Sequence, residues 1–168
     1  MTPAKAAKPA KARNKARKAV KVALAPLAAV ERLQVAALPW RDLDGLEIML
    51  VSSRETRRWI IPKGWPMAGR SNSVAAAIEA IEEAGLLGAI SVEPIGFYTY
   101  AKRFSRKVEP CRVDVYALRV VRQRDAWPEK HERETRWFPA AEAMEAVSDP
   151  ELAELIAGFI RSHPAPGV

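Results

Sequence analysis

Cysteines, histidines and long apolar runs are scarce in this chain of 168 residues, and each scarcity excludes a class of protein. The single cysteine, Cys111, cannot form an internal disulfide, so a disulfide-stapled secreted domain is excluded and a reducing cytoplasm is the expected location. No apolar stretch approaches the ~18 residues that a membrane-spanning helix needs, so we expect no contact with a membrane. The two histidines, His131 and His163, lack the spacing of metal ligands and are expected at the surface.

Acidic residues are absent from the first 21 positions, which carry eight lysines and arginines. The other 147 residues carry 19 basic and 20 acidic side chains, so the net charge of +7 belongs to an N-terminal tail. Residues 1–27 have too few large apolar side chains to offset the entropy cost of ordering, so we expect a disordered tail. Such a tail fits weak, salt-sensitive contact with nucleic acid or another polyanion, or, as we favour, a solubilising extension. It lacks the apolar core of a secretory signal and fits a mitochondrial transit peptide poorly.

After the tail, short apolar segments alternate with turns, and they predict strands, one helix, more strands and two closing helices. The expected strands lie at 28–37, 46–51, 59–61, 95–104, 112–121 and 135–138. The expected helices lie at 73–86, 140–147 and 150–162. This order predicts an α/β fold in which helices pack on the faces of a mixed sheet, formed by one domain over residues 28–168.

The helix expected at 73–86 has an acidic side and an apolar side. At about 100° per residue, three glutamates fall within an arc of about 100°: Glu79, Glu82 and Glu83. The residues on the opposite side, which we expect to pack on the sheet, are Val74, Ala77, Ile78, Ile81 and Gly85. Like charges within one turn repel each other. A hard divalent cation such as Mg²⁺ or Mn²⁺ would offset that repulsion, and a solvated acidic face is the alternative.

Residues of this helix and of the loop before it follow a recognisable spacing. The spacing joins Gly64, Glu79, Glu82, Glu83, Gly85 and Leu86. It resembles the box of the Nudix family, G-x5-E-x7-R-E-U-x-E-E-x-G-U, in which U is apolar and the whole forms a loop, a helix and a second loop. The resemblance therefore implies a Nudix-like α/β/α sandwich.

Two positions depart from that pattern. Arg70 stands where the family has Glu, and Ile78 stands where it has Arg. In the family these two residues pair and fix the loop to the helix. Both partners are missing together here, so no unpaired charge is left behind. We interpret the change as one that affects the rigidity of the loop more than the chemistry.

Segments outside the box extend the resemblance over the chain from about residue 28 to about residue 160. The stretches 50–54, 58–64, 96–103, 111–121 and 136–138, together with Trp127, resemble the diphosphoinositol polyphosphate phosphohydrolase branch of the family. Only the basic tail falls outside this similarity.

The resemblance implies a metal-dependent reaction. Glu79 and Glu83 would hold Mg²⁺, with Mn²⁺ as a substitute, the carbonyl of Gly64 would add a ligand, and Glu82 would act as ligand or base. Such metals neutralise phosphoryl charge and activate water. Removal of Glu83 is expected to abolish turnover and to spare the fold. A catalytic base outside the box is common in the family. The candidates here are Glu129, Glu132 and Glu134. The alternative for each is a solvated loop residue without a catalytic role.

Basic residues flank the box on both sides. Those expected to bind substrate phosphates are Arg54, Arg58, Lys63, Lys102 and Arg103. One basic group precedes the box and the other follows it, and they also include Arg57, Arg106 and Lys107. We expect both groups to converge on one rim of the sheet, where they would bind phosphates. The alternative is that these residues are solvated cations of loops. Trp65, in the box loop, would either stack on a base or sugar or brace the loop. Trp59, Trp137 and Cys111 are expected to pack in the interior.

The leading interpretation is a Nudix pyrophosphatase that hydrolyses a phosphoanhydride bond in a highly phosphorylated small molecule. Diphosphoinositol polyphosphates and diadenosine polyphosphates are the favoured substrates. The first alternative is a pyrophosphatase for ADP-ribose or another nucleotide sugar. A non-catalytic nucleotide- or RNA-binding module and an enzyme that decaps RNA 5′ ends are the others. The sequence predicts no oligomeric state.

Overall fold

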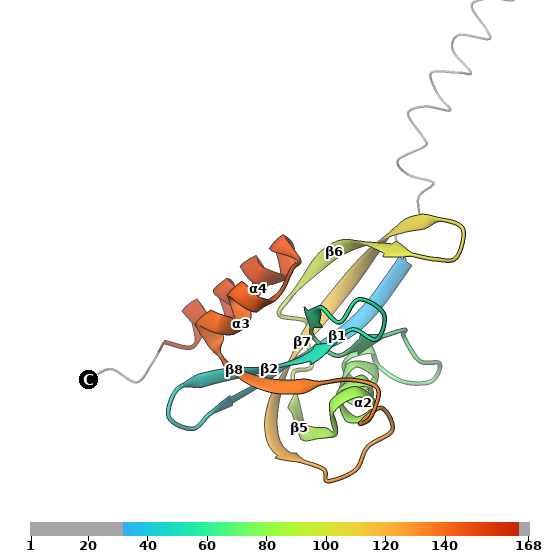
Figure 1. Cartoon of the computed structure of the whole chain (residues 1–168). Coiled ribbons are helices and arrows are strands. Elements are labelled where there is room, and N and C mark those ends of the chain that lie inside the picture. The colour runs from blue at the N-terminus through green and yellow to red at the C-terminus, as the bar shows by residue number, and fades with distance from the viewer. Residues whose placement is uncertain (1–31, 165–168) are drawn as a thin grey trace, which may run out of the picture. The chain divides into compact units, whose positions relative to one another are not determined.

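The computed structural model describes residues 32–164, and a mixed sheet forms the centre of this part (Figure 1). The first strand, β1 (Arg32–Asp42), runs parallel to the long strand β7 (Val108–Gln123). β1 also pairs in antiparallel fashion with β2 (Leu46–Ser52) and with the two-residue strand β4 (Lys63–Gly64). The loop that begins at Gly64 is therefore tied to the middle of the sheet.

Four further strands extend the sheet, all through antiparallel pairs. β3 (Trp59–Ile60) and β8 (Thr135–Pro139) pair with β2. β5 (Leu86–Ile90) and β6 (Gly96–Arg103) pair with β7. Strands that are far apart in the sequence thus lie side by side, which brings the segments before β8 and along β6 close to the middle strands.

Helices cover both faces of the sheet. Successive side chains of a strand point to opposite faces, and β1 is apolar and buried on both. Val35 packs on the side of α2 (Asn72–Ala84), whereas Leu38 packs on the side of α3 (Ala140–Ala146) and α4 (Pro150–Ser162). This arrangement is the predicted α/β/α sandwich. Within residues 32–164, no helix is long and apolar enough to cross a membrane.

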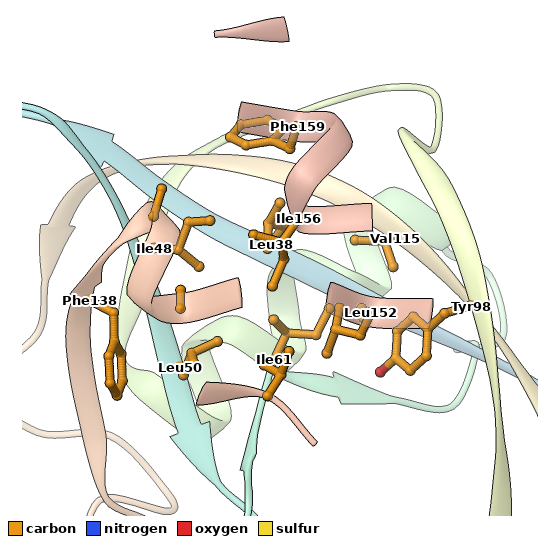
Figure 2. Packing of buried hydrophobic residues seen from close by; sticks show 14 of the residues in the cluster. Leu38, Ile48, Leu50, Ile61, Tyr98, Val115, Phe138, Leu152, Ile156 and Phe159 are labelled. Carbon is orange, nitrogen blue, oxygen red and sulfur yellow. The ribbon is translucent and has the colours of Figure 1, made fainter. Parts of the chain in front are cut away.

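The larger apolar cluster lies between the sheet and α4 (Figure 2). Side chains of the sheet layer meet those of the helix layer there: Leu38, Ile48, Leu50 and Ile61 against Leu152, Ile156 and Phe159. Burial of each such side chain contributes about 1.5–3 kcal/mol. The cluster fixes the face of the sheet opposite α2, so α2 and its loop are supported by a rigid platform.

The predicted order of the elements after the tail is confirmed, with shifts at their ends. β1 continues to Asp42, beyond the expected end of the first strand. The last helix has the expected bounds, because Asp149 caps its first turn and Pro150 follows in the first position. The tail predicted at residues 1–27 lies outside the described residues. The expected burial of Cys111 is confirmed, and Trp59 and Trp137 pack against the two apolar clusters.

Two strands escaped prediction, the two-residue strand β4 and β5. The helix was expected to continue to 86, but Gly85 ends it in the left-handed conformation (φ 66°), and β5 starts at the next residue. No turn residues separate the two elements, so the pattern gives no signal for a strand. Gly88 lies at a bulge in β5, where a Cβ would overlap the backbone of Arg119.

The predicted orientation of α2 is wrong. The residues that α2 buries are Ser73, Ala75, Ala76, Ala80, Glu83 and Ala84. Val74, expected to pack on the sheet, is 38% exposed. The small alanine side chains allow the helix axis to approach β1 and β4 closely, which isoleucines on that side would prevent. The helix is therefore turned so that Glu83 faces the interior.

Candidate functional site

The backbone of Gly64 lies directly against the carboxylate of Glu79. β4 is paired with β1, and α2 packs on the same strand, so the box loop and the box helix meet over the sheet. A Cβ at position 64 would overlap the Glu79 carboxylate. A Cβ would push the flexible end of the Glu79 side chain away, so glycine is what lets this main-chain segment lie beside a half-buried acid.

Glu83, one turn further along α2, forms a buried ion pair with Arg133. Glu83 is 3% exposed, and the Arg133 side chain is 8% exposed. Nη2 of Arg133 donates to Oε1 of Glu83 at 3.0 Å, whereas Oε2 of Glu83 is buried without a hydrogen-bond partner. The expectation that Glu83 lies on the polar arc of the helix, away from the interior, is therefore wrong. Glu82, in contrast, is exposed as predicted.

The segment between β7 and β8 reaches the box because it closes the C-terminal end of α2. The last carbonyls of a helix lack partners within it. Here the Glu82 carbonyl accepts from the Glu129 N–H at 3.0 Å, and the Ala84 carbonyl accepts from Nε2 of Gln123 at 3.0 Å. The Trp127 ring packs so closely on Gly85 that a Cβ there would lie 2.5 Å from it. These contacts carry Glu129 and Arg133 to the box.

One pocket of about 1300 Å³ brings together the three box glutamates, Gly64 and the five cations expected to bind substrate phosphates. Its lining includes Arg54, Arg58, Lys63, Gly64, Glu79, Glu82, Glu83, Lys102 and Arg103. Acidic groups from α2 and basic groups from the loops before the box and from β6 thus face one space. The expected convergence of the two basic groups holds for these five cations.

Other candidates lie elsewhere. Arg57 donates to the Glu132 carbonyl at 3.0 Å, and Lys107 is paired with Glu109, so neither lines the pocket. Of the three candidate bases outside the box, Glu129 lines the pocket, whereas Glu132 and Glu134 do not. The carboxylate of Glu129 lies between two cations, 3.3 Å from Arg54 and 3.6 Å from Arg133.

Aromatic rings accompany the basic side chains of the pocket. Nζ of Lys63 lies 5.3 Å from the centre of the Tyr100 ring, and Nζ of Lys102 lies 5.7 Å from that of Trp65. Such cation–ring contacts hold the ammonium groups in place without neutralising them. Trp65 itself is 42% exposed and lines the pocket, so its ring face is accessible.

The acids of the box are poorly solvated. Burial, together with the neighbouring carboxylates of Glu82 and Glu129, raises the pKa of Glu79 to about 7, against the opposing effect of Arg133 and Lys63. Burial also raises the pKa of Glu83, against the opposing effect of Arg133. Lys63 shows the converse, since burial lowers its pKa and Glu83 opposes that shift. The site therefore concentrates negative charge that further cations would stabilise.

The donor atoms fit a hard divalent cation. Within residues 32–164 no three His, Cys, Asp or Glu side chains are preassembled around one point, because Glu83 is turned to Arg133 and Glu82 extends into solvent. The unpartnered Oε2 of Glu83 and the carboxylate held against Gly64 are nevertheless oxygen donors of the kind that Mg²⁺ and Mn²⁺ prefer.

Sequence reasoning missed Arg133. It lies between Glu132 and Glu134, which were considered as bases, but its partner is 50 residues away, so no spacing reveals the pair. Gln34 and Glu151 were also missed, although both line the pocket. Gln34 accepts from the Tyr100 hydroxyl at 2.6 Å, and Glu151 accepts from the Thr99 backbone at 2.7 Å. Each is a long-range contact that depends on the pairing of strands.

Comparisons with known proteins agree with this geometry. Nudix hydrolase 12, mitochondrial, of Arabidopsis thaliana is 31% identical over 123 residues, which are 71% of this chain and 61% of that protein. The chain thus spans about three fifths of that relative. The crystal structure of the C. elegans Ap4A hydrolase has a TM-score of 0.58 at 18% identity, covering 80% of this chain and all of that one.

A second structure shares the fold. The NUDIX domain of Shewanella oneidensis NrtR, crystallised with ADP ribose, has a TM-score of 0.60 at 17% identity, covering 85% of this chain and 98% of that one. The model of the NUDIX domain family matches residues 31–159, most of the chain. With the box glutamates and Gly64 in one pocket, this match shows that the chain belongs to the NUDIX domain family.

Proposed function

We propose that this protein is a metal-dependent Nudix pyrophosphatase that hydrolyses a phosphoanhydride bond in a highly phosphorylated small molecule. One observation carries the proposal: three box glutamates and five cations line the same pocket. A pocket that only bound a neutral ligand would need neither group. The diphosphoinositol polyphosphate and diadenosine polyphosphate classes are the substrates that this mixture of charges fits best.

Each acidic residue has a proposed role. Glu79 and Glu83, with the carbonyl of Gly64, would hold Mg²⁺ or Mn²⁺. When bound, the ion would neutralise phosphoryl charge and activate a water molecule. Glu82 is exposed at the pocket and would serve as a further ligand or as the base that orients water. Glu129 is the second candidate for the base, because its carboxylate also lines the pocket.

The basic residues have the complementary role. Arg54, Arg58, Lys63, Lys102 and Arg103 would contact the phosphates that remain away from the reacting bond. Lys63 and Lys102 are held by aromatic rings, so their ammonium groups are ordered before substrate arrives. Ordered cations lower the entropy cost of binding a flexible polyphosphate.

A nucleotide substrate is the second candidate, and one observation favours it. The exposed ring of Trp65 beside Lys102 can stack on a base while the cation binds a phosphate. This extends the proposal to ADP-ribose and nucleotide sugars. A non-catalytic nucleotide- or RNA-binding module is the remaining alternative, for which the tail would supply polyanion contact. A cytoplasmic location is proposed from the reduced, buried Cys111.

Formation of the hydrolysis products of a substrate panel, separated by ion-exchange chromatography, in Mg²⁺ or Mn²⁺, tests the proposal. The panel contains a diphosphoinositol polyphosphate, a diadenosine polyphosphate, ADP-ribose and triphosphorylated RNA. The test variant is Glu82→Gln, because Glu82 is exposed and its loss leaves the buried Glu83–Arg133 pair intact. Glu154→Gln, in an exposed ion pair of α4, is the matched control.

We expect turnover of one substrate class that Glu82→Gln lowers by at least about 100-fold and that the control leaves unchanged. No turnover of any panel member, with retained binding of one, would overturn the enzyme and support the binding module. Turnover that is identical in Glu82→Gln and wild type would remove Glu82 from the mechanism.

A further inference from the structure

The two departures from the box leave the box loop and α2 without the Glu–Arg pair of the family pattern, but the structure contains another Arg–Glu pair at α2. Arg70 is exposed, and Ile78 carries no charge. The guanidinium in contact with a box glutamate is that of Arg133, which comes from the segment before β8 and reaches Glu83 at 3.0 Å. A buried arginine from outside the box therefore contacts the box helix α2.

Arg133 is fixed from several directions. Its Nη1 donates to the Ser52 carbonyl at the end of β2 at 3.1 Å, while Nη2 donates to Glu83 and lies 3.6 Å from Glu129. The side chain is 8% exposed, unlike the surface pair of Arg161 and Glu154, whose side chains are 68% and 77% exposed. A buried, multiply bonded guanidinium has one orientation, so it imposes one orientation on its partner.

The contact uses only half of the Glu83 carboxylate. Oε1 accepts from Arg133, whereas Oε2 is buried and lacks any hydrogen-bond partner. A buried acceptor left without a partner costs free energy, and such atoms in native proteins call for a ligand or water. Arg133 thus holds one oxygen and leaves the other available.

We propose that Arg133 is the positioning residue for Glu83 and that it orients the free carboxylate oxygen towards the divalent cation, in a box that lacks the family's loop–helix pair. The inference rests on the proposed metal-dependent function. It adds that a residue outside the box determines how well the box binds its ion. Partners of metal ligands act in this way in other sites, where their loss lowers affinity about 10–100-fold.

A competing effect has the opposite sign. Arg133 is a cation, so its charge repels a bound metal ion and its hydrogen bond competes for Glu83. If that effect dominated, removal of Arg133 would strengthen metal binding. Orientation dominates here because the Arg133 guanidinium is anchored to the Ser52 carbonyl and holds only one oxygen of the Glu83 carboxylate, which leaves the other without a partner.

Mn²⁺ titrations of the metal-free protein, followed by the EPR signal of free Mn²⁺ at fixed pH and ionic strength, test the inference. The variants are Arg133→Met, which keeps the length of the side chain, and Arg133→Lys, which keeps the charge but offers no fork of donors. Arg161→Met is the matched control, because it removes an arginine from an exposed Arg–Glu pair. The double variant Glu83→Gln/Arg133→Met is compared with Glu83→Gln alone.

We expect the Kd for Mn²⁺ to rise about 10–100-fold in Arg133→Met, to rise less in Arg133→Lys and to stay unchanged in Arg161→Met. In the Glu83→Gln background, the further change to Arg133→Met should have no effect, because Arg133 acts through Glu83. Unchanged or tighter Mn²⁺ binding in Arg133→Met overturns the inference. If Arg133→Met does not fold, wild-type affinity in Arg133→Lys overturns it.

Activity separates this inference from the proposed function. Wild-type protein that binds Mn²⁺ but hydrolyses no panel substrate removes the proposed reaction and leaves the role of Arg133 to be decided by the titrations. Wild-type protein that binds no Mn²⁺ overturns both.

Discussion

The carboxylate of Glu79 lies so close to the backbone of Gly64 that no Cβ fits between them. The contact joins β4 to α2, the loop and the helix of the box. It explains in physical terms why the box requires glycine at its first position. The backbone conformation of Gly64 is one that other residues adopt, because its φ lies outside the left-handed region. The requirement is one of space.

Gly64→Ala should therefore displace Glu79 while the fold persists. Because a misplacement of about 1 Å in a catalytic group can cost about 100-fold, we expect a loss of that order in kcat/KM and weaker Mn²⁺ binding. Steady-state kinetics and Mn²⁺ titration measure both. Gly158→Ala in α4 is the control, since its nearest contact is 3.6 Å away, and it should stabilise the protein by about 0.4–1 kcal/mol. Wild-type metal binding in Gly64→Ala would contradict the steric argument.

The raised pKa of Glu79 predicts how the stability of the metal-free protein changes with pH. The pKa is about 7 in the folded protein against an ordinary value of 4.5. Between these values the unfolded chain releases the proton first, so the free energy of unfolding falls as pH rises from about 4.5 to about 7. Above that range the contribution of Glu79 is constant, and below it the contribution vanishes.

Thermal unfolding in EDTA between pH 4.5 and 8 measures this dependence. Glu79→Gln should flatten the fall in Tm, because glutamine carries no proton to release. Mg²⁺ should restore stability above pH 7 in the wild type and less so in the variant. A Tm profile of Glu79→Gln that parallels the wild type would show that other groups, such as the buried Glu83, dominate the pH dependence.

Glu83 and Glu82 are neighbours in the sequence, but their neutralisation should affect stability differently. Glu83→Gln leaves the buried Arg133 without its counter-charge, and breaking a buried ion pair costs about 3–5 kcal/mol. Glu82→Gln changes an exposed side chain and should stay within about 0.5 kcal/mol. Urea unfolding in EDTA measures both. Equal stability of the two variants would mean that the Glu83–Arg133 pair contributes nothing net to the fold.

The elements and the box were predictable because they depend on local signals. Strand periodicity and the spacing of the box residues are read within short stretches of the sequence. The orientation of α2 was not predictable in this way. The apolar pattern favours Ile78 and Ile81 as the buried side, but close packing against β1 selected alanines, and Arg133 made the burial of Glu83 possible.

The same distinction separates the site residues that were found from those that were missed. Residues of the box and its basic flanks have fixed spacing or lie in charged clusters, so they could be proposed from the sequence. Arg133 contacts Glu83 only because the segment after β7 closes the end of α2. Contacts of that kind are set by strand pairing over long separations, for which one sequence carries no pattern.

Trp65 provides a test between the two substrate classes. Its ring is 42% exposed in the pocket with Lys102 beside it, so its truncation removes a stacking surface and little core packing. Stacking of a base on an aromatic ring contributes about 1–3 kcal/mol.

If the substrate contains a base, Trp65→Ala should raise KM by the factor that corresponds to this free energy, with little change in kcat or Tm. If the substrate is an inositol polyphosphate, which has no base, Trp65→Ala removes only the ring that holds Lys102, so KM should rise by less than for the base-containing substrate. Steady-state kinetics of Trp65→Ala and Trp65→Phe on both substrate classes distinguish the two cases. Phenylalanine retains an aromatic face, so Trp65→Phe should recover part of the stacking affinity only for the base-containing substrate. A loss of kcat with a lowered Tm in Trp65→Ala would instead assign the ring to bracing the box loop.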